Sequence, residues 1–257
     1  MAEELCTTAA QPSLIFASSI NQWSVAQKYL LASPCLQSGR YPVLLRWHSR
    51  SAAETINAVL DSKPAASWLV FLHQDVFLPE GWADRFCAAL TDAEAQLGRL
   101  EVVGAYGIRG AGSQAQRAGR VLDRGKLLDE PAPLPCLVDS LDELLFAVRA
   151  DTRLRLDTAL GFDFYATDLV LQAQAAGLQC AVVDAYCEHW SATASQGTAP
   201  DSLIQRIARS AQVFEHKWLA RLPVTTPCFH IDRPGDTLAF LEVIRHLPSI
   251  DRAEART

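Results

Sequence analysis

The stretch Trp68-Leu69-Val70-Phe71-Leu72-His73-Gln74-Asp75 decides the fold. Its five consecutive apolar residues predict a strand that is buried on both faces, as in a sheet covered by helices on each side. The apolar run stops at a polar tripeptide, and Pro79-Glu80-Gly81 predicts a turn before a helix over residues 82–97. The sequence therefore predicts an α/β protein with polar side chains at the carboxyl end of a central strand, where open α/β sheets bind their ligands.

Strand-like and helix-like segments alternate on both sides of this stretch, which predicts the crossover connections of an α/β sheet. Short apolar runs predict further strands at 14–17, 41–45, 101–104, 144–148 and 180–183. Amphipathic or capped segments predict further helices at 25–31, 51–60, 167–176, 201–222 and 236–247. Residues 107–135 are rich in Gly, Arg and Pro and are predicted to form a long surface loop.

Composition excludes several classes of protein. The chain has 257 residues, of which 49% are hydrophobic and 20% charged, as in a globular protein. A net charge of −6 excludes a wide surface for nucleic acid, but it leaves room for a small pocket that binds one nucleotide through a cation. The sequence has no apolar run long enough to cross a bilayer, and its polar start, residues 1–12, predicts a flexible N-terminus without a secretion signal. Seven cysteines without a Cys-x-x-Cys pair predict reduced thiols in a cytosolic protein.

Candidate metal ligands follow two of the predicted strands. His73 and Asp75 are two residues apart, and in an extended segment both side chains would point the same way and reach one ion. The alternative is a polar strand end whose side chains hydrogen-bond to nearby backbone. His189 comes after the strand at 180–183 and would bring a third ligand to the same edge, although a single histidine at a strand end is more often structural.

Candidate acids lie in the second half of the chain. Asp168, in the first turn of the predicted helix at 167–176, either caps that helix or acts as a general base. Asp142 and Glu143 adjoin an apolar run and either form a turn or bind sugar hydroxyls. A nicotinamide-dependent dehydrogenase would need a glycine-rich loop between the first strand and the first helix, and residues 18–22 contain no glycine.

Several of these residues resemble family-2-type glycosyltransferases, and more narrowly a bacterial glycosyltransferase-like subfamily associated with surface polysaccharide assembly. In that subfamily the Asp-x-Asp motif reads His-Gln-Asp. The resemblance covers about residues 14–191. It is carried, in order, by Ser19-Ile20-Asn21, Ser51-Ala52-Ala53-Glu54, Asn57, His73-Gln74-Asp75, Asp142-Glu143, Gly161-Phe162-Asp163-Phe164-Tyr165, Asp168 and His189.

The resemblance implies a GT-A-like fold, a three-layer α/β/α sandwich with a mostly parallel central sheet and a C-terminal helical appendage. The implied catalytic domain spans residues 13–199, and residues 200–257 form an extension packed on it. The implied reaction moves a sugar from a nucleotide-diphospho-sugar to a hydroxyl of a glycan or lipid-linked acceptor with the help of Mn²⁺ or Mg²⁺. Such a protein would be cytoplasmic or peripheral at the inner face of the membrane, and a homodimer is left open.

The resemblance also implies roles for individual residues. His73, Asp75 and His189 would hold the metal, and Asp168 would be the general base of an inverting transfer. The donor nucleotide would contact Ser19, Asn21, Asn57, His73 and Asp75, and the acceptor would contact Asp142, Glu143 and Tyr165.

Two departures from the family pattern matter for activity. His73 replaces the first Asp of the motif, which weakens the binding of Mg²⁺ more than that of Mn²⁺. Thr167 replaces a Glu beside Asp168. They favour the alternative function, a catalytically silent homologue that binds a nucleotide sugar or a glycan as a partner subunit.

Overall fold

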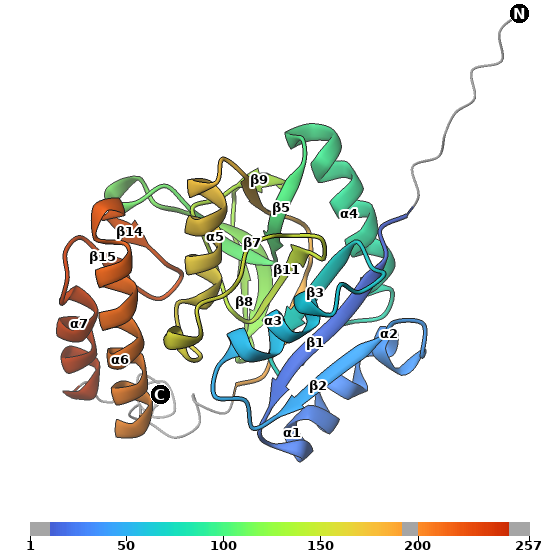
Figure 1. Ribbon diagram of the computed structural model, residues 1–257, viewed down its shortest axis with the longest axis horizontal. Helices are drawn as coiled ribbons and strands as arrows, with labels where there is room; N and C mark the ends of the chain where they lie inside the picture. The colour runs from blue at the N-terminus through green and yellow to red at the C-terminus, as the bar shows by residue number, and fades with distance from the viewer. Residues whose placement is uncertain (1–10, 192–199, 247–257) are drawn as a thin grey trace, which may run out of the picture.

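A central seven-stranded sheet organises the computed structural model, which describes residues 11–191 and 200–246 (Figure 1). In the order β2-β1-β3-β11-β5-β12-β9, its strands are Val43–Trp47, Leu14–Ile20, Trp68–Leu72, Leu145–Arg149, Leu100–Gly104, Gln179–Val182 and Cys136–Leu137. Five of the seven strands run in one direction, and β11 and β9 run against them. The predicted α/β class with a mostly parallel sheet is confirmed.

Helices cover both faces of this sheet. They are α1 (Trp23–Lys28), η1 (Leu30–Ala32), α2 (Pro34–Gln37), α3 (Ala52–Asp61), α4 (Trp82–Leu97), η3 (Thr158–Leu160) and α5 (Tyr165–Ala175). Val70 and Leu72 of β3 pack with α4 in one core cluster, and Leu69 and Phe71 pack with α3 and α5 in another. Because neighbouring residues of a strand point to opposite faces, every side chain of β3 is buried, which explains its unbroken apolar run.

Local signals placed two helices correctly. The Ser51 hydroxyl accepts a hydrogen bond from the Glu54 backbone N–H at 3.2 Å, so α3 begins at the predicted cap. Helix α4 has the predicted bounds. By contrast, α6 (Asp201–Lys217) ends five residues before the predicted end, and the chain continues as the short 3₁₀ helix η5 (Leu219–Arg221).

The predicted surface loop at 107–135 is wrong, because most of it is β-sheet. The segment contains β6 (Tyr106–Arg109), β7 (Gln116–Asp123) and β8 (Lys126–Asp129), with η2 (Gly112–Gln114) between β6 and β7. These three strands form a six-stranded sheet with β10 (Ser140–Leu141), β13 (Cys187–His189) and β4 (Val76–Phe77). The strands are antiparallel in this segment and close through tight turns, so they need no long apolar run. Arg124 and Gly125, both at positive φ, join β7 to β8 as a two-residue hairpin turn.

Gly119 in β7 is required by the close approach of β6. Its φ is +111°, and a Cβ atom there would collide with the backbone carbonyl oxygen of Ala105. We expect Gly119→Ala to lower the free energy of unfolding by about 2–4 kcal/mol, about 1 from the positive φ and the rest from the collision. Gly125→Ala is the matched control, since Gly125 has φ +82° and open space around it. Chemical denaturation of both variants checks this, and equal losses would show that the contact with Ala105 is unimportant.

The C-terminal segment packs against the outer side of α5. It comprises α6, η5, the hairpin strands β14 (Val224–Thr225) and β15 (His230–Ile231), and α7 (Asp236–His246). A third core cluster joins Leu160 and Leu171 on the sheet side to Phe214 and Ile231 of this segment. In Figure 1, α6 lies to the left of α5, and α7 lies beyond α6 at the left edge of the molecule. The predicted boundary at residue 199 and the first ten residues of the predicted flexible start at 1–12 lie outside the described residues.

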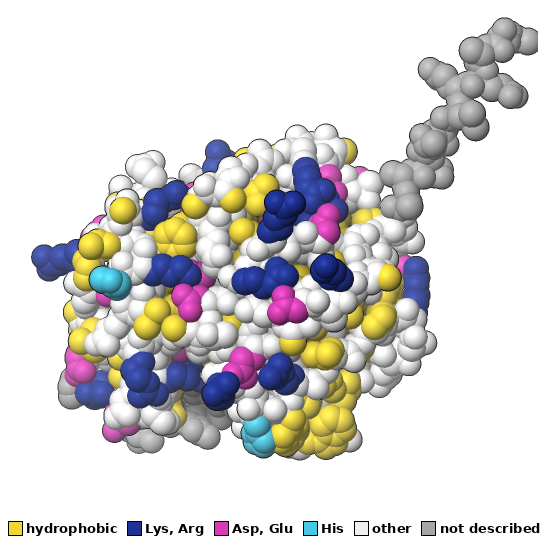
Figure 2. Space-filling model, in the orientation of Figure 1, with side chains coloured by type: hydrophobic (Ala, Val, Ile, Leu, Met, Phe, Trp, Pro, Cys, Tyr) yellow, Lys and Arg dark blue, Asp and Glu magenta, His cyan; other side chains and the backbone are white. Residues whose placement is uncertain are grey.

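Figure 2 shows Lys and Arg side chains interspersed with Asp and Glu over the visible face. Exposed ion pairs of the described surface include Arg155–Asp61 and Arg40–Asp84. Each exposed pair contributes about 0–1 kcal/mol. Within the described residues, no helix has both the length and the apolar character that crossing a bilayer requires.

Candidate metal centre

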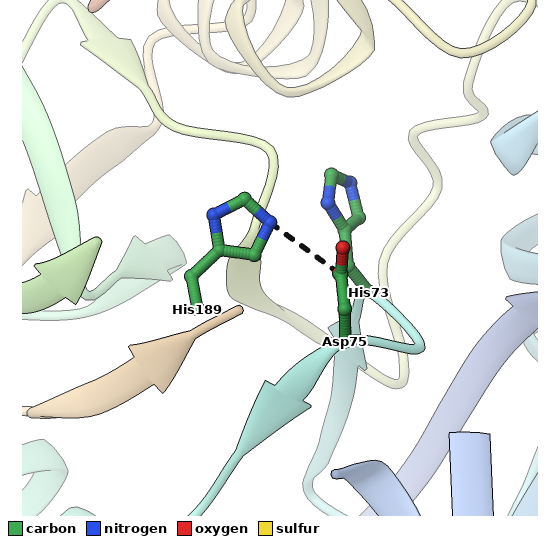
Figure 3. Close-up of side chains that lie close together, drawn as sticks. All are labelled: His73, Asp75 and His189. Atoms are coloured by element: carbon green, nitrogen blue, oxygen red, sulfur yellow. Dashed lines mark ion pairs between the residues drawn. The ribbon is translucent and has the colours of Figure 1, made fainter. Parts of the chain in front are cut away.

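Three predicted ligands converge in the structure. His73 and Asp75 follow β3, and His189 ends β13. One ligand atom from each residue lies within 4.8 Å of the other two. Figure 3 shows the three side chains facing one another, with His189 Nε2 at 3.4 Å from Asp75 Oδ1.

A turn, rather than an extended strand, brings His73 and Asp75 together. The His73 backbone N–H donates to the Leu144 carbonyl at 2.9 Å, which continues the pairing of β3 with β11 by one residue. The chain then bends, and the Val76 N–H donates to the His73 carbonyl at 3.2 Å. The prediction of an extended segment was therefore wrong, although both side chains still reach the same cluster.

Strand pairing in the second sheet delivers His189. Its register with β4 places His189 opposite Val76, and the Trp190 N–H donates to the Asp75 carbonyl at 2.9 Å. On the other side of β13, His189 lies opposite Asp123 of β7. The cluster therefore lies where the chain passes from the first sheet to the second.

Asp123 orients the imidazole of His189. Its Oδ1 lies 2.8 Å from His189 Nδ1, so Nε2 is the ring nitrogen left for the cluster. A carboxylate that fixes the far nitrogen of a histidine is a usual companion of metal-binding histidines. Sequence reasoning missed Asp123 because β7 was predicted to be loop, and nothing in its sequence neighbourhood distinguishes it from the other acids of the segment.

Tyr165 orients His73 in a similar way. The Tyr165 hydroxyl donates its single proton to the Glu143 carbonyl oxygen at 3.1 Å, so it accepts a hydrogen bond from His73 Nε2 at 2.8 Å. A neutral His73 that carries its proton on Nε2 has its lone pair on Nδ1. The nitrogen available to an ion is therefore Nδ1.

The charges of the cluster suit a cation. Burial lowers the pKa of His73 to about 4, so this imidazole is neutral at pH 7. Burial also disfavours the charged form of His189, but hydrogen bonds to Asp123 and Asp75 outweigh it and raise the His189 pKa to about 10. Despite burial, the same interactions lower the pKa of Asp75 and of Asp123, which keeps both carboxylates ionised. In the metal-free cluster, His189 thus carries a proton on Nε2, and an ion would displace this proton.

The cluster lies on the wall of a cavity of about 800 Å³. The segment after β1 forms another wall, and Gln74 attaches it to the tripeptide. Gln74 accepts from the Asn21 and Gln22 backbone N–H groups and donates to Asn21 Oδ1 at 2.7 Å. Tyr29 and Trp190, stacked with ring centroids 6.0 Å apart, also line the cavity.

Five of the predicted site residues line this cavity, namely Ser19, Asn21, His73, Asp75 and His189. Asn57, predicted to contact the donor, is not among the lining residues. Its side-chain amide instead binds the backbone N–H and carbonyl of Leu156, both at 2.9 Å. Both polar atoms of the amide therefore serve a structural contact, which argues against the predicted contact with the donor.

The predicted acceptor residues lie behind the cavity wall rather than on it. Asp142 accepts from the Leu144 N–H at 3.0 Å, and burial raises its pKa. Burial and the nearby Asp163 raise the pKa of Glu143 well above its usual value, and its Oε1 has no partner among the described residues. Tyr165 is fully buried and supports His73. Their geometry argues against direct contact with an acceptor in this conformation.

Asp168 is also placed away from the cavity. It is 0% exposed, and its carboxylate pairs with Lys217 Nζ at 2.7 Å. Trp218 Nε1 and Gln172 Nε2 each donate to it at 2.7 Å. A base must reach the proton that it removes. A carboxylate enclosed by three donors does not, so the geometry argues against the predicted role of Asp168 as general base.

The residues of the cluster fit a divalent ion. Two ligands of one ion at bond lengths of about 2.1 Å are separated by about 3 Å, close to the 3.4 Å between His189 Nε2 and Asp75 Oδ1. Two imidazole nitrogens with one carboxylate suit Mn²⁺ and other transition metals better than Mg²⁺, which prefers oxygen ligands.

Comparison of the chain with family models and with curated protein sequences finds no match. Among solved structures, the crystal structure of A197 from STIV has a TM-score of 0.42 and 12% identity, covering 68% of this chain and 82% of that one. Mannosyltransferase PcManGT from Pyrobaculum calidifontis, in complex with GDP-Man and Mn²⁺, has a TM-score of 0.48 and 12% identity, covering 92% and 70%. GalNAc-T7 with UDP, GalNAc and Mn²⁺ has a TM-score of 0.48 and 8% identity, covering 96% of this chain and 57% of that one. At TM-scores below 0.5 these likenesses are partial, so the fold class of this chain rests on its own sheet topology.

Proposed function

We propose that this chain is a metal-dependent glycosyltransferase that uses a nucleotide-diphospho-sugar. One observation carries the proposal: His73, Asp75 and His189 converge on the wall of a cavity of about 800 Å³ beside the carboxyl end of β3. Carboxyl ends of strands are where α/β sheets bind ligands, and this cavity has a volume typical of small-molecule sites. The His-Gln-Asp stretch resembles family-2-type glycosyltransferases, and the mostly parallel α/β sheet agrees with the GT-A-like fold that this resemblance implies. Both support the same function.

His73 Nδ1, an oxygen of Asp75 and His189 Nε2 would hold the ion, with Mn²⁺ preferred to Mg²⁺. When bound, the ion would neutralise the charge that develops on the diphosphate leaving group. Asp123 and Tyr165 hold the two imidazoles in the required orientation and tautomer. Ser19, near the end of β1, and Asn21, directly after this strand, lie on the cavity wall and would contact the nucleotide.

A second candidate function is a catalytically silent protein that binds a nucleotide sugar or a glycan. It is favoured by the chemistry of the cavity wall, because Asp75 is the only carboxylate among the described residues that line it. With Asp75 committed to the ion, no lining carboxylate remains to deprotonate an acceptor hydroxyl in an inverting transfer. An active enzyme would therefore need another group at the acceptor side, or a stereochemical course without such a base.

From the resemblance alone we infer the remaining aspects of function. The acceptor would be a glycan or lipid-linked hydroxyl in bacterial surface polysaccharide assembly. The protein would act in the cytoplasm or at the inner face of the membrane.

Donor binding and donor hydrolysis separate the two functions. Thermal shift with a panel of nucleoside diphosphates, with and without Mn²⁺, identifies the nucleotide, because a ligand that binds the folded state raises Tm. Slow Mn²⁺-dependent hydrolysis of the matching nucleotide-sugar would support the enzyme, and binding without turnover would support the silent protein. If no nucleoside diphosphate raises Tm in the presence of Mn²⁺, the proposed function is wrong.

The affinity for Mn²⁺ should rise with pH. His189 keeps its proton below a pKa of about 10 and must lose it to bind the ion, whereas His73, with a pKa of about 4, is already neutral. One displaced proton gives about a tenfold gain per pH unit, or about a hundredfold between pH 6 and pH 8. Isothermal titration calorimetry in buffers of different ionisation enthalpy measures both the affinity and the proton released. His189→Gln is the control and should remove the slope, while a flat profile in the wild-type protein would contradict the assignment.

A further inference from the structure

A cationic side chain from the C-terminal extension also lines the cavity. Arg206 lies in the second turn of α6, outside residues 13–199, and belongs to the same cavity wall as His73 and Asp75. Sequence analysis assigned it no role, because α6 was recognised only by its apolar stripe. Its side chain remains 44% exposed.

The guanidinium of Arg206 is held in place by a buried carboxylate. Arg206 Nε donates to Asp163 Oδ2 at 3.0 Å, and Nη2 donates to Asp163 Oδ1 at 2.9 Å. The Ser210 hydroxyl donates to the same carboxylate at 3.1 Å, and Asp163 is 7% exposed. This bidentate contact leaves Nη1 as the nitrogen without a partner among the described residues. A guanidinium that is already oriented loses less conformational entropy when it binds a ligand.

The remaining acid near Arg206 does not compete for it. Glu143 lies close enough to Arg206 and Asp163 to feel their charges, and burial and Asp163 raise its pKa well above the usual value, but within the described residues no ion pair joins it to Arg206. Asp163 is thus the one anionic partner of Arg206 that the structure describes. The two N–H bonds of Nη1 remain for a ligand in the cavity.

We propose that Arg206 binds the diphosphate of the donor through Nη1, so that the diphosphate lies between this guanidinium and the ion held by His73, Asp75 and His189. Arginine suits this position because its N–H groups match phosphate oxygens and its charge persists at every physiological pH. The inference rests on the proposed function for the identity of the ligand. It also makes residues 200–246 part of the binding site rather than only an appendage.

The test compares Arg206→Gln with two controls in the full chain. Arg209→Gln changes an exposed arginine on the same helix that does not line the cavity. Asp163→Asn breaks the same ion pair but keeps the guanidinium, so it separates the loss of Arg206 from the loss of the pair. The probes are inorganic pyrophosphate, UDP and GDP with Mn²⁺, uridine and guanosine as phosphate-free ligands, and Mn²⁺ alone.

We expect Arg206→Gln to weaken the binding of pyrophosphate, and of whichever nucleoside diphosphate binds more tightly, by about tenfold or more. This is the usual effect of losing a hydrogen bond to a charged group. Mn²⁺ alone and the nucleosides should bind this variant as they bind the wild type. Arg209→Gln should retain diphosphate affinity within about threefold. Asp163→Asn keeps the guanidinium but loses the carboxylate that orients it, so its loss of affinity should be smaller than that of Arg206→Gln. Circular dichroism of each variant confirms that it is folded under the conditions of the assay.

Three results would overturn the proposal. The first is an unchanged diphosphate affinity in Arg206→Gln. The second is a loss of affinity in Asp163→Asn as large as that in Arg206→Gln, which would assign the effect to the ion pair. In both cases the proposed function stands if the wild-type protein binds a nucleoside diphosphate with Mn²⁺. If the wild-type protein binds no diphosphate at all, both proposals fail. Conversely, binding through Arg206 without sugar transfer would leave this inference intact and support the silent protein.

Discussion

Asp75→Asn is expected to abolish Mn²⁺ binding at concentrations that saturate the wild-type protein. Asp75 is the only anionic member of the cluster, and it also forms an ion pair with His189. Loss of a residue in the outer shell of a metal site costs about 10–100-fold in affinity, so loss of the charged ligand itself should cost about a hundredfold or more. Sugar transfer or donor hydrolysis that depends on the ion should disappear together with it.

Thermal shift measures this effect without any assay of activity. At about 100 times its Kd, Mn²⁺ should stabilise the wild-type protein by about 2.7 kcal/mol and raise Tm by roughly 5–10 °C. Asp75→Asn should show no rise at the same concentration. Asp84→Asn, at an exposed position on α4, is the matched control and should respond like the wild type. A Tm rise in Asp75→Asn equal to that of the wild type would place the ion elsewhere.

Asp168→Ala is expected to destabilise the fold strongly, because Asp168 joins α5 to the end of α6. The substitution removes the partner of Lys217 from a position that is 0% exposed and leaves the Trp218 and Gln172 donors unpaired. Lys217 is 29% exposed and keeps Asp157 at 3.1 Å, which moderates the loss. We expect a decrease of about 3 kcal/mol in the free energy of unfolding and a fall in Tm of roughly 6–12 °C.

Two further variants separate this structural role from the role of a general base. Asp157→Ala removes the more exposed partner of Lys217 and should cost about 1 kcal/mol. Asp168→Asn keeps an acceptor for Trp218, so its stability should lie between those of Asp168→Ala and the wild type. If Asp168→Asn loses all transfer activity while its Tm is unchanged, Asp168 is the base after all and the cavity must open toward it. Differential scanning calorimetry and donor turnover on the same samples distinguish these outcomes.

The central strands could be predicted because their physical signal is local. Trp68–Leu72 is apolar throughout since both of its faces are covered, and this condition marks the strand, its end and the polar tripeptide that follows. Ser51 and Gly81 similarly mark the starts of α3 and α4 through capping and turn preferences. For the same reason, His73 and Asp75 could be predicted to reach one ion at the end of this strand.

The second sheet and the residues behind the cluster could not be predicted in the same way. Strand β6 has only four residues, β7 and β8 are partly exposed, and glycines interrupt β6 and β7, so the composition of this segment matches that of a loop. Asp123 reaches His189 only through the pairing of β7 with β13, across 66 positions of sequence. Arg206 reaches the cavity only because α6 packs on α5. Contacts of this kind depend on tertiary packing, which no local pattern encodes.

The three ligands belong to two different sheets, and this arrangement has a consequence for the choice of ion. His189 moves with β13, whose neighbour β7 presents the buried Val121 opposite Cys187, whereas His73 is fixed by β11. Because protein interiors are close-packed, a change of one methylene group at Val121 would shift β13 and alter the span across the site. Under the proposed function, selectivity among ions of different radius would therefore depend on interior positions that are not ligands of the metal.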